Sequence, residues 1–151
     1  MNWNQNKSIL LSRICIIAFA VLLTAVDFGA YWLVAWLISI SSVLGGLQNR
    51  SLLFAVIYCC SILAWILLFS LWKLLQNMKA GIIFQADNVR YLRLTSWCCF
   101  GVCAICCTSA FFYVPMILIA ISAGFIGLIV RIVKNVFEQA RAMKEELDFT
   151  V

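Results

Sequence analysis

The sequence predicts an all-α integral membrane protein: a four-helix bundle of two antiparallel transmembrane hairpins with a cytoplasmic helical extension at the C-terminus. Three observations favour this fold class. The 151-residue chain is 66% hydrophobic and 11% charged, whereas a soluble domain has about 25% charged residues. Its mean hydropathy of +1.06 implies more apolar surface than a water-soluble fold of this size can bury. Long uncharged runs alternate with short segments that gather Lys and Arg. A single domain over residues 1–151 is expected.

The first apolar run begins beside Lys7 and Arg13. It is longer than the roughly 7–15 apolar residues of a cleaved signal peptide, so it predicts a retained signal-anchor. Between residues 14 and 49 the only charge is Asp27. A continuous helix over that distance would be about 54 Å long, against a hydrocarbon core of about 30 Å.

We therefore expect the first span to cover residues 9–30 and to break near Asp27 and Gly29. An outer segment over 31–46 would then lie at the membrane interface, where Tyr and Trp settle at headgroup level. The alternative is one long tilted helix that reaches Ile40.

The remaining uncharged runs predict spans over residues 51–74, 94–112 and 115–130. A charged loop over 73–93 joins the second span to the third. Only a few residues separate the third and fourth spans, which predicts a tight antiparallel hairpin. Pro115 suits the first turn of the fourth helix, because its missing N–H would have no partner there.

The basic residues predict the orientation. Of the eleven Lys and Arg residues, only Arg50 falls on the outer side of these spans. The positive-inside rule then places both termini and the central loop in the cytoplasm. The others are Lys7, Arg13, Lys73, Lys79, Arg90, Arg93, Arg131, Lys134, Arg141 and Lys144. They flank apolar runs and form no continuous patch, so we expect contact with anionic membrane lipids and no direct nucleic-acid binding.

The tail over residues 131–151 predicts a continuing helix with an apolar seam. The seam residues recur at spacings of 4, 3, 4, 3 and 4: Ile129, Val133, Val136, Ala140, Met143 and Leu147. Weak ion pairs are expected between Glu138 and Arg141, Arg141 and Glu145, and Lys144 and Asp148. Packing of the seam on the chain's own central loop is favoured; a second copy in a homodimer and a partner protein are the alternatives.

Eight cysteines include Cys103 and Cys106, which have the C-x-x-C spacing of thiol redox motifs. A membrane thiol–quinone oxidoreductase would need a partner dithiol in an outer loop, and the outer loops contain no cysteine. The chain has no histidine, and no acidic residue lies near the cysteines. We therefore favour packing, with no metal site, cofactor or catalytic residue expected. Cys99, Cys103, Cys106 and Cys107 are expected on one helical face.

The fourth span has small residues four apart, Ala120 with Gly124 and Ala123 with Gly127. This pattern permits close approach of two backbones in lipid. We expect it to meet the third span within the hairpin; a dimer face is the alternative.

Asp27 is the only acidic residue within an expected span, which by default indicates a functional role. A small proton-coupled carrier would use such a carboxylate, with Tyr31 and Trp32 one turn onward. However, Asp27 lies about 27 Å from Ile9 along a helix, nearer the outer surface than the midplane. Solvation or a capping role is therefore favoured.

Two cytoplasmic pieces, LLQNMKAGIIFQADNVRYLR and VFEQARAMKEELDFTV, resemble those of the bacterial domain-of-unknown-function 2975 membrane proteins. The matching positions are Gly81, Phe84, Asn88, Leu92 and Arg93 in the loop, and Lys144, Glu145, Glu146, Asp148 and Thr150 in the tail. Gln85 departs from the family's usual Ser or Thr, and Leu147 replaces an Asn.

The resemblance implies a protein of the bacterial inner membrane with four spans, both termini inside and no established activity. The family's genes often lie beside a small helix-turn-helix transcriptional regulator, which implies a non-enzymatic membrane partner or sensor for such a protein. The partner-binding residues would be Gly81, Phe84, Asn88, Arg90, Arg93, Glu145, Glu146 and Asp148. The same residues also suit a loop that folds against its own tail.

Overall fold

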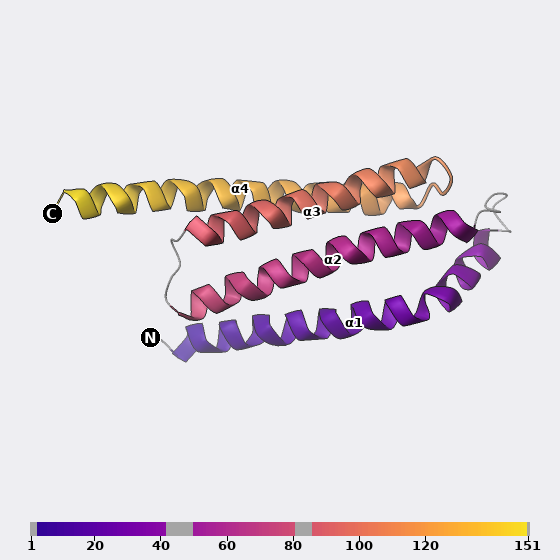
Figure 1. The fold of residues 1–151 in the computed structure, drawn as a ribbon, viewed down its shortest axis with the longest axis horizontal. Helices are drawn as coiled ribbons and strands as arrows, with labels where there is room; N and C mark the ends of the chain where they lie inside the picture. The colour runs from indigo at the N-terminus through magenta and orange to yellow at the C-terminus, as the bar shows by residue number, and fades with distance from the viewer. Residues whose placement is uncertain (1–2, 42–49, 81–85, 151) are drawn as a thin grey trace.

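The structure is a computed structural model that describes residues 3–41, 50–80 and 86–150. These residues form four helices, and the described part of the chain contains no strand: α1 (Trp3–Ser41), α2 (Arg50–Lys79), α3 (Ala86–Ala110) and α4 (Met116–Phe149). All four are long and apolar enough to cross a membrane. The predicted all-α class with four membrane-type helices is confirmed (Figure 1).

Polar side chains within the apolar helices bond to their own backbone. The hydroxyl of Thr24 donates to the carbonyl of Val21 at 2.7 Å, and that of Ser122 donates to the carbonyl of Leu118 at 2.8 Å. Such local bonds satisfy a hydroxyl that lipid cannot hydrate. The helices therefore tolerate Ser and Thr along their apolar length.

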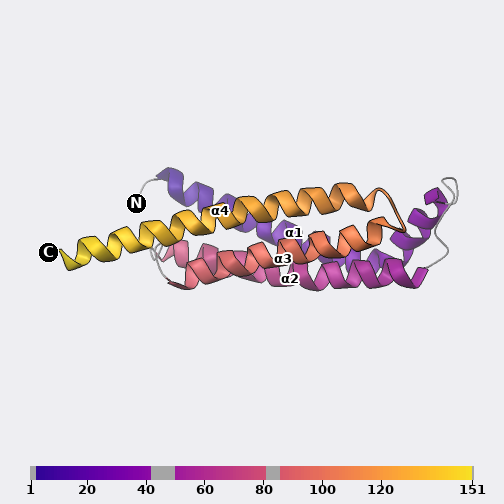
Figure 2. The same ribbon diagram turned by 90° about the horizontal axis from the view of Figure 1, so that it is seen from above.

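The helices alternate in direction, so both termini lie at one end of the bundle, which we call the termini end; the other is the opposite end (Figure 1). Among the described residues the backbones pack in chain order: α1 on α2, α2 on α3 and α3 on α4. Figure 2 shows α1 and α4 running obliquely to the nearly parallel pair of α2 and α3. The bundle is therefore a row of helices.

The tight hairpin between α3 and α4 is confirmed. The N–H groups of Phe112 and Tyr113 both donate to the carbonyl of Ser109 at 3.0 Å. Pro115 takes the N-cap position with φ −57°, directly before Met116. Its fixed φ suits the helix start.

The expected break near Asp27 and Gly29 is wrong, because α1 continues as one helix to Ser41. The structure has the long helix that was the alternative, and α1 bends near its end instead of stopping (Figure 1). The bend follows Gly29, the only glycine in α1, and glycine is a common site of helix kinks. The interfacial position of the 31–46 segment stays a prediction, and residues 42–46 lie outside the described residues.

The part of α1 that follows the bend contributes to a small core at the opposite end of the bundle. Val34 of α1, Leu53 of α2 and Met116 of α4 are buried there as one cluster. Tyr113 from the α3–α4 turn packs against it. Elsewhere most large apolar side chains are exposed, which is expected where lipid covers the helices.

Candidate functional site

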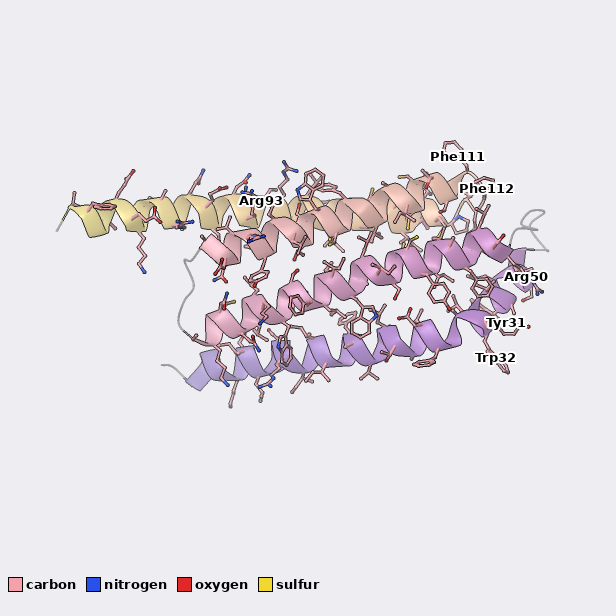
Figure 3. The ribbon with its side chains drawn as sticks, viewed as in Figure 1. Tyr31, Trp32, Arg50, Arg93, Phe111 and Phe112 are labelled. Atoms are coloured by element: carbon pink, nitrogen blue, oxygen red, sulfur yellow. The ribbon has the colours of Figure 1, made fainter. Side chains whose placement is uncertain are left out.

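The two ends of the bundle differ in chemistry. The antiparallel helices gather the basic residues toward the termini end, with Arg50 at the opposite end (Figure 3). Tyr31 and Trp32 project from the bend of α1, and Phe111 and Phe112 from the α3–α4 turn (Figure 3). Exposed aromatic side chains at one end match the aromatic belt of membrane proteins. Two charged segments at the termini end, the start of α3 and the end of α4, form the candidate site.

The first segment is the start of α3. A hollow of about 520 Å³ is lined by Asp87, Arg90, Tyr91, Arg93, Leu94 and Trp97. Arg90 and Arg93 are both exposed, so the structure brings together two residues predicted for partner binding. Arginine beside Tyr and Trp is the combination that dominates many protein interfaces.

The hollow is joined to α4 by a charged cluster. Nζ of Lys134 lies 2.7 Å from Oε2 of Glu138, and a guanidinium nitrogen of Arg93 lies 3.8 Å from Oε1 of the same carboxylate. The hydrogen bond from Lys134, followed by the charges of Lys134 and Arg93, lowers the pKa of Glu138. The sequence predicted an ion pair between Glu138 and Arg141. In the structure Glu138 pairs instead with Lys134 and Arg93.

The second segment is the end of α4. Gly127 of α4 faces Cys99 and Phe100 of α3. Because the two helices are antiparallel, Ala86 at the start of α3, about 13 residues before this contact, lies opposite about residue 141 of α4. The last eight residues of α4 therefore extend about 12 Å beyond α3 at about 1.5 Å per residue. Figure 1 shows this projection past the other helices.

The projecting end of α4 has an apolar stripe beside charged groups. Met143 is 58% exposed and Leu147 is 68% exposed, and residues four apart share a helical face. Arg141 Nε donates to Oε1 of Glu145 at 2.8 Å, as predicted, and Glu146 is exposed. Residues 81–85 of the central loop lie outside the described residues, so packing of the seam on its own loop stays a prediction.

Asn88 has a structural position that the sequence did not indicate. Its side chain is 0% exposed, and its Oδ1 accepts a 2.7 Å hydrogen bond from Nδ2 of Asn77 on α2. A completely buried amide has no surface to offer a partner, so we remove Asn88 from the partner-binding set. Gly81 and Phe84 lie outside the described residues, as does the side chain of Asp148 and with it the predicted Lys144–Asp148 pair.

A family model described as a protein of unknown function (DUF2975) matches residues 32–151. The match includes both pieces on which the resemblance was based, the 73–93 loop and the tail. The chain belongs to the DUF2975 family. No curated protein and no solved structure matches the chain.

The small residues of α4 in this DUF2975 protein meet α3, as predicted. Ala120 is completely buried. A Cβ at Gly124 would lie 3.2 Å from Sγ of Cys103, and one at Gly127 would lie 3.1 Å from Cβ of Cys99. The cysteines therefore fill the narrow space between the two helices, which supports their role in packing.

The cysteines of α3 face two neighbours. Cys99 and Cys103 contact α4, whereas Cys106 lies beside Cys60 of α2. The pairing of Cys60 with Cys106 was not predicted, because the register of α2 against α3 is not visible in the sequence. Among the described residues, no group of three or more His, Cys, Asp or Glu side chains could hold a metal ion.

Asp27 has a partner that sequence reasoning missed. Nε1 of Trp65 on α2 donates to Oδ2 of Asp27 at 3.2 Å. The other oxygen, Oδ1, is buried without a hydrogen-bond partner in the structure. Tyr31 and Trp32, the aromatic residues expected near Asp27, are exposed and point away from the bundle (Figure 3).

Proposed function

We propose that this DUF2975 protein is a non-enzymatic membrane partner for a cytoplasmic protein. The docking surface consists of the hollow at the start of α3 and the projecting end of α4. The observation that carries the proposal is the exposed stripe of Met143 and Leu147 on a charged helix that extends beyond the rest of the bundle.

The physical argument rests on the solvent at that end. The uncharged part of α4 ends before Arg131, and the 15 residues from Met116 to Val130 cover about 22 Å. Met143 lies about 18 Å beyond Arg131 along the helix, which is past the headgroups of a bilayer. In water, two exposed apolar side chains on one face favour an amphipathic contact with another protein.

The charges support a protein partner with acidic and apolar groups. Arg90 and Arg93 line the hollow, and Arg93 also contacts Glu138 of α4. An acidic side chain of a partner can compete for these guanidinium groups while its apolar face covers the Met143 stripe. The small helix-turn-helix regulator implied by the family resemblance is the partner that we propose.

Site-specific photo-crosslinking in intact bacteria tests the proposal. A photoreactive residue at Met143 or Leu147 should yield an adduct with a small DNA-binding protein, identified by mass spectrometry. The matched control is Ile121, which is also exposed on α4 but lies within the span. An adduct of two copies of this chain at Met143 would favour the homodimer, and the absence of any adduct there would contradict the proposal.

Charge reversal tests the hollow. R90E with R93E should reduce recovery of the partner from detergent-solubilised membranes to background, because reversed charges repel where the native ones attracted. R50E reverses an exposed charge at the opposite end of the bundle, outside the docking surface, and should leave recovery unchanged. Equal recovery with all variants would remove the hollow from the docking surface.

The proposed orientation has its own test. A reporter enzyme that is active only in the cytoplasm should be active when fused after Val151, because the basic residues at the termini end keep that end inside. The same reporter placed between Phe112 and Val114 should be inactive. Activity of the second fusion alone would invert the orientation and exclude a cytoplasmic partner.

A further inference from the structure

A groove between α1 and α2 at the termini end lies outside the proposed docking surface. It has a volume of about 230 Å³ and is lined by Ile9, Arg13, Trp72, Leu75, Gln76 and Lys79. Two of these six side chains are basic and one is an amide, so the groove combines hydrogen-bond donors with apolar walls.

The groove holds its basic groups in a defined arrangement. The guanidinium carbon of Arg13 lies 5.0 Å from the centre of the Trp72 ring, a cation–π contact that restricts the Arg13 side chain. Gln76 and Lys79 follow Trp72 at spacings of four and three residues, which places all three on one face of α2. Arg13 and Lys79 therefore flank the same space from two helices.

No carboxylate of α1 or α2 neutralises this charge. The sequence of α2 contains no Asp or Glu, and Asp27 is the only acidic residue of α1. Fourteen residues separate Arg13 from Asp27, about 21 Å along the helix. The groove is therefore a site for an anion.

The depth of the groove matches the phosphates of a bilayer. The uncharged stretch of α2 from Ser51 to Trp72 is about 33 Å long, close to the thickness of a hydrocarbon core of about 30 Å. Trp72 and the Arg13 side chain stacked on it thus lie at the boundary of the hydrocarbon. Lys79 lies about 10 Å further along α2, within the headgroup layer or just beyond it.

We propose that this groove binds an anionic phospholipid through its headgroup phosphate. Arg13 and Lys79 pair with the phosphate, and the amide of Gln76 donates a hydrogen bond to it. Ile9 and Leu75 contact the carbon atoms of the headgroup. The two positive charges favour a lipid with net negative charge over a zwitterionic one.

Native mass spectrometry of the whole protein in detergent tests this site with phosphatidylglycerol, phosphatidylcholine and inorganic phosphate as probes. Phosphatidylglycerol should bind more tightly than phosphatidylcholine. R13Q and K79Q should each weaken its binding about fivefold, which corresponds to about 1 kcal/mol per basic residue at a membrane surface. K144Q removes the same charge from the projecting end of α4 and should leave binding unchanged.

Three results would overturn the site. Equal binding of the two lipids would exclude selection by charge. An equal loss in K144Q would indicate general attraction to the whole basic end. Displacement of phosphatidylglycerol by inorganic phosphate at equal concentration would indicate a site for free phosphate. Because Arg13, Trp72 and Lys79 lie outside the docking surface, these results are independent of the partner experiment.

Discussion

Nδ2 of Asn77 on α2 donates a 2.7 Å hydrogen bond to Oδ1 of Asn88 on α3, and Asn88 is completely buried. The two residues lie on either side of the connection between these helices. The bond therefore fixes the two helices against each other at the base of the docking surface.

Replacement of Asn88 by Leu should destabilise the protein by about 1–3 kcal/mol, because it leaves the Asn77 amide without its acceptor. The double variant N77L with N88L should recover part of this loss, since the Asn77 donor is then removed together with its acceptor. Thermal unfolding in detergent measures both. Additive losses in the double variant would show that the two amides do not act as a pair.

The close approach of α3 and α4 predicts opposite effects at two glycines. G127A should destabilise by about 1–3 kcal/mol, because the new Cβ would crowd Cys99 and the Phe100 ring. G29A is the matched control: a Cβ there meets nothing within 4 Å. Alanine should therefore stabilise α1 by about 0.5–1 kcal/mol. Denaturant titration compares the two variants, and equal effects would contradict the tight α3–α4 interface.

The ionisation of Glu138 predicts that the stability of the fold depends on pH. Its pKa is lowered below 4.5, first by the hydrogen bond from Lys134 and then by nearby positive charges. A pKa that is lower in the folded state means that the carboxylate stabilises the fold above pH 4.5, and that this contribution is lost as the pH falls through the folded pKa. The melting temperature of the wild type should fall more steeply below pH 4.5 than that of E138Q. Parallel curves would show that the ion pairs of Glu138 do not stabilise the fold.

The hydrogen bond between Trp65 and Asp27 predicts which of two variants, W65F or D27N, is the less stable. W65F removes the donor and should destabilise by about 1–3 kcal/mol, because the Asp27 carboxylate then loses the hydrogen bond from Trp65 Nε1. D27N keeps an oxygen that accepts from Trp65 and removes the charge, so its loss should be smaller. Thermal unfolding in detergent ranks the two variants, and the reverse order would indicate that the carboxylate charge itself is required.

The four helices and their antiparallel order could be predicted because charge and hydropathy act locally along the chain. The continuation of α1 past Asp27 to Ser41 could not be predicted. Asp27 looked like the end of a span because its partner, Trp65, comes from another helix 38 residues later. The contact between α3 and α4 was predictable from two pairs, Ala120 with Gly124 and Ala123 with Gly127, since small residues four apart in a span indicate a close approach of two helices.

The candidate site was predicted only in part, for the same physical reason. Arg90 and Arg93 are exposed as expected, but the tie from Arg93 to Glu138 depends on the register of α3 against α4. Asn88 sits in a polar stretch that suggested a surface loop, and only its partner Asn77 on the neighbouring helix makes it a core residue. Pairings across helices require the register, which hydropathy does not contain.

The packing of the helices in chain order has a consequence for biosynthesis. The helices α2, α3 and α4 each pack against the helix directly before them in the chain, so α1 and α2 can associate while the ribosome is still translating α3. Contacts between segments close in sequence form quickly. The protein should thus assemble stepwise at the translocon, and the projecting end of α4 should emerge after the helices that support it are in place.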